Sequence, residues 1–343
     1  MRSFLKINFI FFIILFSVKN LYAQDLHFSQ YFNAPLLVNP ANTGFNPEFD
    51  YRIGGNYRNQ WQSVTTNPYK TMSVWGDAQL FTNRFDEAWV GVGGALLQDV
   101  AGSGNLTSTR AYLSVAYHQI MGLNSLLSGG FNIGFTQKRI DLTKLTFNTQ
   151  WNGTFFDINI PSGEPFVYNS ASYFTLQAGL KYSWFATDNL YLSAGISALN
   201  VNNPNESFFN TNNDFTRVKP RYTFFADASL MVDKVWILNP NFYYSTMGTA
   251  KEIVFGGIIQ RDLSASGDGS LQLLAGGYYR VSDAIIPMIG FDIKNFKITF
   301  NYDATTSSLK TFNQSRGAYE ISIVKSGSYK GREKSIKCPT VRF

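Results

Sequence analysis

The sequence is poor in the residues that support catalysis, metal binding and covalent cross-linking. It contains one cysteine, Cys338, so no disulfide can form within the chain. Its two histidines, His27 and His118, are far apart, and it has no CxxC pair, no GxSxG elbow and no glycine-rich phosphate loop. These absences predict a protein that is not an enzyme and that holds no cofactor and no metal.

Long apolar runs are also absent beyond the start of the chain. Residues 1–23 carry a basic start, an apolar run over Phe9–Phe16 and the small residue Ala23, which is the pattern of a cleaved signal peptide. This run is too short for a membrane-spanning helix, and no later window approaches the roughly 18 apolar residues that such a helix needs. We therefore expect an exported protein that begins at Gln24 and has no helical span.

A strong basic charge is absent from the body of the chain, although the formal net charge is +6. The signal peptide holds three basic residues, and residues 325–343 hold six basic residues and one acidic residue. The remaining body is close to neutral, without the basic stripe that binds nucleic acid. We expect a short basic tail over 325–343, on the periplasmic side, and no nucleic-acid partner.

What the chain does have is an alternation of apolar and polar residues with a period of two, clearest over Tyr69–Phe81. Successive side chains of a β-strand point to opposite faces, so this segment has one apolar face and one polar face. The apolar face holds Met72, Val74, Gly76, Ala78 and Leu80, and the polar face holds Thr71, Ser73, Trp75, Asp77 and Gln79.

The pattern recurs about fourteen times, in segments of roughly 9–13 residues, a length that crosses a bilayer when the strand is tilted. Aromatic residues make up 16% of the chain and gather near segment ends, as in the interfacial girdles of membrane barrels. We predict an all-β fold, a transmembrane outer-membrane β-barrel of about 14 antiparallel strands over residues 49–324. The predicted strands are 49–61, 69–81, 88–98, 106–119, 125–137, 172–184, 189–199, 221–232, 235–244, 250–260, 270–280, 284–293, 296–303 and 317–324.

The length of each connection depends on whether the strand before it is odd-numbered or even-numbered in the predicted order. Short connections follow even-numbered strands, as at 120–124, 185–188, 233–234 and 294–295. The longest connections follow odd-numbered strands, at 138–171, 200–220 and 304–316. Bacterial barrels have short periplasmic turns and longer outer loops. The parity therefore predicts that both mature termini lie on the periplasmic side.

Residues 24–48 lack the alternation and combine asparagine and proline with many apolar side chains. We interpret them as an ordered leader packed against or inside the barrel, because a free tail would not be this apolar. Charged residues on the inward faces are mixed in sign, so we expect them to pair across a lumen that is closed or plugged. These expected lumen-lining charges are Arg52, Asp77, Arg110, Lys181, Asp227, Asp292, Lys297, Asp303 and Glu320.

Aromatic residues in the two longest connections are candidates for contact with a partner. Residues 138–171 are too apolar for a solvated loop, so we expect them to fold over or into the barrel mouth. The candidate partner-binding residues are Trp151, Phe155 and Phe156 in this loop, Phe208 and Phe209 in the next, and Lys334, Lys337 and Cys338 in the tail.

Motifs at both ends of the mature chain carry a resemblance to a known family. They are His27–Tyr31, Asn39–Gly44, Tyr57–Trp61 and Ser73–Asp77 at one end, and Tyr302–Asp303, Ser307–Leu309 and Gly317–Ser322 at the other. With these motifs in order, the sequence resembles the PorP/SprF family, outer-membrane proteins of the type IX secretion and gliding machinery of Bacteroidota. The resemblance implies a non-enzymatic membrane component, with no catalytic residues to carry over.

The resemblance implies partners of two kinds. One branch of the family is a core part of the secretion apparatus, linked to a periplasmic ring and its motor. The other branch consists of accessory barrels, each commonly paired with a large secreted adhesin whose C-terminal sorting domain it helps to export or to hold at the surface. We therefore expect a barrel in outer-membrane lipid that docks such an adhesin, the periplasmic ring proteins, or both.

Two other interpretations stay open at this point. A porin or transporter for a small or hydrophobic nutrient would need a continuous lumen wide enough for the solute. A soluble β-sandwich would need its outward faces to pack against each other, and heat-modifiable migration in detergent gels would exclude it.

Overall fold

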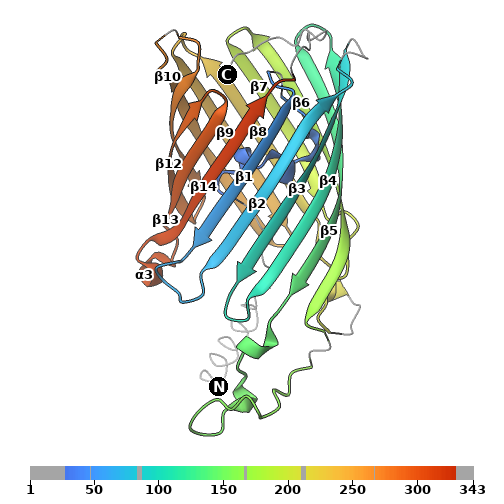
Figure 1. Ribbon diagram of the computed structural model, residues 1–343, viewed down its shortest axis with the longest axis vertical. Helices are drawn as coiled ribbons and strands as arrows, with labels where there is room; N and C mark the ends of the chain where they lie inside the picture. The colour runs from blue at the N-terminus through green and yellow to red at the C-terminus, as the bar shows by residue number, and fades with distance from the viewer. Residues whose placement is uncertain are drawn as a thin grey trace, which may run out of the picture.

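The computed structural model describes residues 28–46, 48–82, 87–165, 168–209, 214–265 and 267–329. Across these residues, fourteen antiparallel strands pair with their neighbours in sequence, and the first pairs with the last to close a barrel (Figure 1). The strands are β1 (Tyr51–Gln60), β2 (Tyr69–Leu80), β3 (Ala88–Ala101), β4 (Leu106–Met121), β5 (Ser125–Arg139), β6 (Ser170–Thr187), β7 (Leu190–Leu199), β8 (Arg221–Met231), β9 (Trp236–Met247), β10 (Ala250–Asp262), β11 (Leu271–Arg280), β12 (Ala284–Ile293), β13 (Phe296–Thr305) and β14 (Arg316–Gly327). The predicted fold class is confirmed, and each predicted strand overlaps an observed one.

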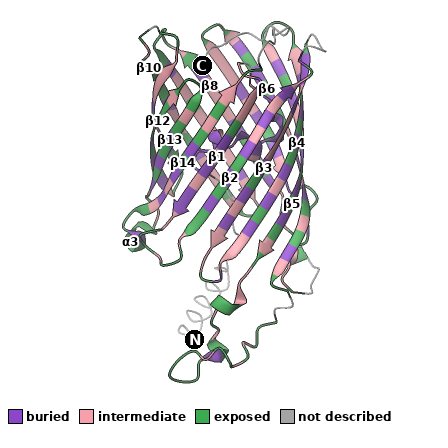
Figure 2. Ribbon diagram, in the orientation of Figure 1, coloured by how far each residue is buried: buried purple, intermediate pink, exposed green. Residues whose placement is uncertain are grey.

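The period-two alternation creates the two faces of the barrel wall (Figure 2). In β2 the outward-facing Val74 is 61% exposed, whereas the inward-facing Trp75 is 2% exposed. In β4, Leu113 is 75% exposed and His118 is fully buried. An apolar outer face and a polar interior are what a barrel in lipid requires. Because β1 pairs with β14, the described strands leave no open sheet edge.

The seam between β1 and β14 is longer than the sequence pattern predicts. It runs from Tyr51 opposite Gly327 to Gln60 opposite Ala318. The predicted boundary between barrel and tail, at residues 324 and 325, therefore falls too early. The backbone of residues 325–327 completes the ladder with β1, although these polar and small residues give no apolar alternation.

The barrel has a short-turn end and a long-loop end. At the short-turn end β1 begins, β14 ends and the connections after even-numbered strands lie. The long-loop end, at the bottom of Figure 1, includes the single turn α3 (Lys310–Asn313). It also includes the connection from β5 to β6, with η3 (Leu142–Lys144) and η4 (Asn148–Gln150). This connection extends away from the barrel in Figure 1, so the expectation that it folds over or into the mouth was wrong.

The leader, residues 28–46, lies inside the barrel and contains three short turns: η1 (Tyr31–Asn33), α2 (Pro35–Val38) and η2 (Pro40–Asn42). The part of the chain that the structure describes contains no helix long and apolar enough to cross a membrane. Ser29 contacts residues near the long-loop ends of β1, β13 and β14, whereas Asn46 contacts β2 near the short-turn end. The leader therefore crosses the lumen from one end to the other.

This path places the first described residue, Phe28, toward the long-loop end of the lumen. Strand parity predicts the short-turn end for both mature termini, and it does place the start of β1 and the end of β14 there. Parity carries no information on the direction of a segment inside the lumen, so it does not predict which end Phe28 lies toward. Residues 24–27 are outside the described residues.

Candidate functional site

The candidate site is the contact between the leader and the lumen wall. Within the described leader, eight backbone carbonyls accept hydrogen bonds from wall side chains, which come from β1, β2, β3, β4, β5, β7 and β8. A buried carbonyl without a partner costs about 1–3 kcal/mol, so these donors make burial of the leader possible. The donors are Trp75, Asn132, Arg221, Ser197, Arg52, His118, Trp89 and Gln79.

Three wall glycines, Gly91 on β3, Gly130 on β5 and Gly179 on β6, form a glycine cradle around Asn39–Gly44. A Cβ atom at any of the three positions would overlap the leader, either its backbone or the side chain of Asn39. The missing side chains therefore let the leader backbone approach the sheet closely. The period-two alternation of the sequence does not distinguish these three glycines from the other strand glycines.

Asn39 fastens the leader to β6 and β7. Its Nδ2 donates to the backbone carbonyls of Leu180 and Ile196, each at 3.0 Å. Its Oδ1 accepts from the backbone N–H of Ala41 at 2.8 Å and so caps η2. One side chain thus joins two wall strands and starts the turn that enters the glycine cradle.

Thr43 and Gly44 form the last turn of the leader inside the cradle. The Nε2–H of His118 donates to the Thr43 carbonyl at 2.8 Å, and Trp89 donates to the Gly44 carbonyl at 3.0 Å. The Gly44 N–H donates to the Asp77 carboxylate at 2.7 Å. Gly44 has a φ of 64°, and a Cβ there would also meet the backbone of Gly91, so this turn requires glycine.

At the long-loop end a group of buried charges holds the start of the leader. The two carboxylate oxygens of Glu320 accept the successive backbone N–H groups of Ser29 and Gln30, each at 2.9 Å. Glu320 also pairs with Arg58 at 3.3 Å. The carboxylate is fully buried, and these three donors satisfy it there.

Asp303 lies between two arginines in the same group. Its Oδ2 is 2.9 Å from Arg58 and 3.1 Å from Arg280, and it accepts from the Ser29 hydroxyl at 2.8 Å. Arg280 also pairs with Glu252 at 3.2 Å. Buried charges are tolerated when they are paired and hydrogen-bonded in this way. We call Arg58, Arg280, Asp303 and Glu320 the polar clamp.

Aromatic side chains pack the leader against the opposite wall. Tyr31 lies 4.7 Å from Tyr243 between ring centroids, and Phe32 stacks on Tyr278 at 5.4 Å. Tyr31 is buried between the leader and this wall. Toward the short-turn end, Lys181 Nζ lies 3.7 Å from the centroid of the Phe45 ring.

The nine charges predicted to line the lumen lie on inward-facing strand positions. Arg52 pairs with Asp77 across β1 and β2. Asp303 pairs with Arg58 and Arg280, and Glu320 pairs with Arg58. These two arginines were not among the predicted lumen-lining charges. The sequence does identify Arg58 as inward-facing, because it lies an even number of residues from Arg52 on the same strand.

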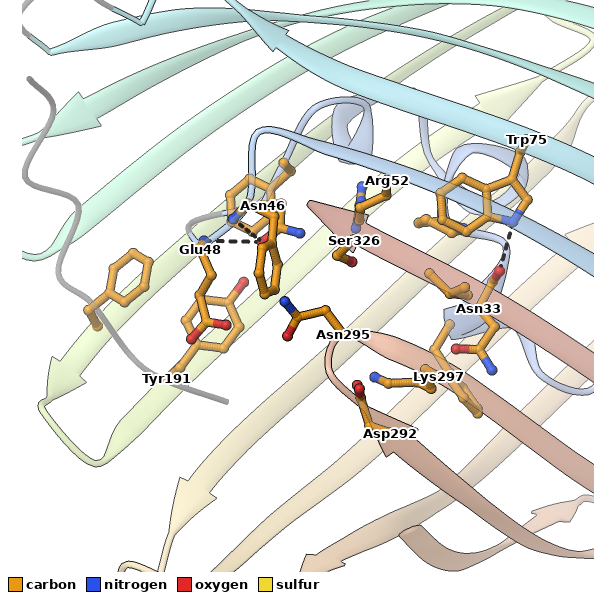
Figure 3. A pocket seen from close by; sticks show the side chains of 16 residues that line it. Asn33, Asn46, Glu48, Arg52, Trp75, Tyr191, Asp292, Asn295, Lys297 and Ser326 are labelled. Atoms are coloured by element: carbon orange, nitrogen blue, oxygen red, sulfur yellow. Dashed lines mark hydrogen bonds between the residues drawn. The ribbon is translucent and has the colours of Figure 1, made fainter. Parts of the chain in front are cut away.

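Cavities lie on both sides of the leader. One of about 610 Å³ lies at the long-loop end, where Lys138 pairs with Glu206 at 2.6 Å. A second, of about 270 Å³, lies at the short-turn end between the leader and β12–β14. Figure 3 shows Glu48 of the segment after the leader facing Asp292 and Lys297 across this second cavity. The leader and its contacts lie between the two cavities.

The candidate partner-binding residues fall into two groups. Trp151, Phe155 and Phe156 are 49%, 58% and 44% exposed, and Trp151 packs edge-to-face on Phe156 at 5.1 Å. Phe209 is 37% exposed, and the Phe208 carbonyl accepts from the backbone of residue 168 at 3.0 Å. The β5–β6 loop thus packs on itself and contacts the β7–β8 connection. The tail candidates Lys334, Lys337 and Cys338 lie outside the described residues.

Within the ranges that the structure describes, no group of three or more His, Cys, Asp or Glu side chains is placed to hold a metal ion. A closed barrel with an apolar outer face and a polar lumen defines the protein as an outer-membrane β-barrel. The chain belongs to the family of type IX secretion system membrane proteins PorP/SprF, whose family model matches residues 20–324. The resemblance seen in the sequence is thereby confirmed. Curated proteins give no match.

Solved structures similar to this chain are also outer-membrane barrels. A Pseudomonas aeruginosa FadL homologue has a TM-score of 0.50 and 9% identity, over 84% of this chain and 92% of the homologue. A deltaS2S3 mutant of TodX, a monoaromatic hydrocarbon channel, has a TM-score of 0.50 and 10% identity, over 85% of this chain and 93% of that protein. At these identities the similarity shows the fold alone.

Proposed function

We propose that this protein is a non-enzymatic docking barrel of type IX secretion, which supports a secreted adhesin at the cell surface or connects the outer membrane to the periplasmic secretion ring. The observation that carries the proposal is the leader inside the lumen. Its carbonyls are bound by seven wall strands, and its start is held by the polar clamp. A barrel filled by its own chain suits a protein that holds partners.

In this proposal the long-loop end faces the outside, as the loop lengths favour. The exposed aromatic group Trp151, Phe155 and Phe156 on the β5–β6 loop is the contact surface for the adhesin. Exposed aromatic side chains that stand away from the lipid are typical of protein-binding surfaces. Membership of a secretion family supports this assignment.

The short-turn end then faces the periplasm and is the side on which ring proteins bind. β14 ends there at Gly327, and Tyr329 remains attached to the rim through a 2.7 Å hydrogen bond from its N–H to Asp50. The basic residues of the sequence after Tyr329 supply charge for this contact. Removal of residues 330–343 is expected to weaken ring binding while the barrel stays folded.

A mild-detergent pull-down of the tagged protein from its own membranes, read by mass spectrometry, tests the proposal. Recovery of one very large secreted protein with a C-terminal sorting domain identifies an adhesin-paired accessory. Recovery of periplasmic ring proteins without an adhesin identifies a core component. Recovery of neither contradicts the docking function.

A matched pair of variants ties the adhesin to the proposed surface. Serine substitutions at Trp151, Phe155 and Phe156 are expected to lose at least tenfold of the recovered adhesin. Phe312→Ser is the control, because Phe312 is 83% exposed in α3 at the same end of the barrel. Equal recovery from the two variants would contradict the role of the β5–β6 loop.

The alternative function is a channel for a small or hydrophobic nutrient. The cavity of about 610 Å³ at the long-loop end is the observation in its favour. Such a channel requires solute to pass the leader. Solute flux through the wild-type protein in liposomes, together with an empty pull-down, would favour the channel over the docking barrel.

A further inference from the structure

We propose that the lumen wall is a peptide-binding site specific for the leader segment Asn39–Gly44, and that the leader occupies it as an exchangeable ligand. The proposed ligand is a peptide of small residues with the sequence Asn-Pro-Ala-Asn-Thr-Gly. The site consists of the glycine cradle together with the wall side chains that donate to the leader carbonyls.

The cradle and the segment fit each other in shape. Gly91, Gly130 and Gly179 give space only to a backbone or a small side chain. The segment supplies this, because Ala41 is fully buried and Gly44 lies directly against Gly91. A larger residue on either side of the contact would collide with the other.

The wall recognises the leader through side chains and through the backbone carbonyls of Leu180 and Ile196, and the strand pairing of the β-sheet does not depend on the leader. No residue of 28–46 belongs to a strand, and each strand of the barrel has both of its neighbours without the leader. The turns of the leader are closed by their own backbone hydrogen bonds, such as Asn42 N–H to the Asn39 carbonyl at 3.0 Å. The leader can therefore leave the lumen without breaking strand pairing.

The path of the chain also permits exchange. Among the described residues, the leader is joined covalently to the barrel at the short-turn end, through the segment that leads into β1 at Tyr51. Its first described residues, next to Ser29, lie within the lumen at the polar clamp. It can be drawn out through the short-turn mouth as one hinged piece, which would join the cavities on its two sides.

The test uses the full chain with Gly44→Val, which damages the ligand and leaves the wall intact. Valine is disfavoured at the φ of 64° and its side chain would meet Gly91. Val38→Cys in a Cys338→Ser background reports on the leader, because position 38 is buried in the lumen. We expect a maleimide to label Gly44→Val at least tenfold faster than the otherwise wild-type reporter protein.

The emptied site should then accept the peptide in trans. A fluorescent synthetic peptide of residues 28–46 is expected to bind the Gly44→Val protein saturably and in a one-to-one ratio. The same peptide carrying Gly44→Val should bind at least tenfold more weakly. The wild-type protein, whose site is occupied by its own leader, should bind little of either peptide.

Neighbouring glycines on β5 supply the control for the wall. Gly130→Val, combined with Gly44→Val, should abolish peptide binding, because Gly130 faces Pro40 and Ala41 of the leader. Gly129→Val in the same background should retain it, because a Cβ at Gly129 makes only an ordinary contact of 3.5 Å with the outward-facing Leu180. Equal binding by the two proteins would overturn the assignment of the site.

Two other results would also overturn the proposal. One is a folded Gly44→Val barrel that labels rapidly and binds no wild-type peptide. The other is a folded Gly44→Val barrel whose cysteine stays protected. If Gly44→Val does not fold, a protease site placed between residues 46 and 49 of the wild-type chain is cut after folding. If the cut leader never exchanges with excess labelled peptide, the proposal is wrong.

Discussion

The two ends of the leader are held by different physical means. At the long-loop end the polar clamp surrounds Ser29 with paired charges, and the Glu320 carboxylate takes the two backbone N–H groups that begin the leader. Deeper in the lumen the glycine cradle holds Asn39–Gly44 by close backbone contact, by neutral hydrogen bonds and by two hydrogen bonds to the Arg52–Asp77 ion pair. At the first end the contacts are mostly with buried charges, whereas the second end depends in addition on the absence of wall side chains.

The difference shows that the same lumen is sensitive to two kinds of substitution. Substitutions that alter the shape of a buried ion pair destabilise the protein. Removing one partner destabilises it more, because the remaining charge is buried without compensation. A glycine contact has no charge to lose, but any added carbon must displace its neighbour. The following predictions separate the two means of attachment, in order of decreasing effect.

Arg58→Met should have the largest effect, because it leaves Asp303 and Glu320 with fewer compensating partners in a buried site. We expect a loss of about 3–5 kcal/mol in the free energy of unfolding. Urea unfolding, followed by heat-modifiable gel migration, measures it. Arg139→Met is the control, since Arg139 is exposed at the end of β5. A stability equal to the control would show that charge does not hold this end.

Gly179→Val should act on the cradle and leave the clamp unchanged. Its side chain would occupy the position of Asn39 Oδ1, so the leader must shift. We expect a cost at the upper end of the roughly 1–3 kcal/mol that overpacking causes. Limited proteolysis of the leader should become faster than in Gly129→Val. Equal cleavage of the two proteins would mean that the cradle tolerates a side chain.

His118→Phe should remove one neutral hydrogen bond and preserve the ring. His118 stacks on Trp89 at 4.8 Å between centroids, and phenylalanine can keep that contact. The Thr43 carbonyl loses its donor, and Ser128, which hydrogen-bonds the other ring nitrogen at 2.8 Å, loses a partner. We expect a loss of about 1–2 kcal/mol in the same unfolding assay. An unchanged stability would indicate that water replaces the imidazole.

Phe155→Ser should have the smallest effect on the barrel. Its side chain is 58% exposed on the β5–β6 loop, which extends away from the barrel in Figure 1. We expect the free energy of unfolding to stay within about 0.5 kcal/mol of wild type. A larger loss in urea unfolding would show that the loop, like the clamp and the cradle, supports the barrel.

The wall of this protein could be predicted from its sequence because strand alternation is a local property. Trp75 and Asp77 were placed inside, and Val74 outside, from a period of two alone. The strand count followed from the repetition of that pattern. The end of β14 was missed because Ser326 has no apolar neighbour pattern and is defined only by its pairing with Arg52.

The sequence predicts that the leader is ordered, but it does not predict how the wall binds the leader. Its contacts join residues that are far apart in the sequence, such as Ser29 with Glu320, and no local pattern encodes them. Gly130 looks like any other strand glycine until the path of residues 39–44 is known. The β5–β6 loop was misplaced for a related reason, because its apolar residues pack on one another while staying partly exposed, as Trp151 and Phe156 do.

The path of the leader also bears on the mechanics of the barrel. It is continuous with β1, and it runs from Ser29 near the long-loop end to Tyr51 at the short-turn rim. Tension applied at either rim would be distributed over the seven strands that bind its carbonyls, rather than concentrated at one bond. While the leader occupies the lumen, the barrel is reinforced along its axis by its own first segment.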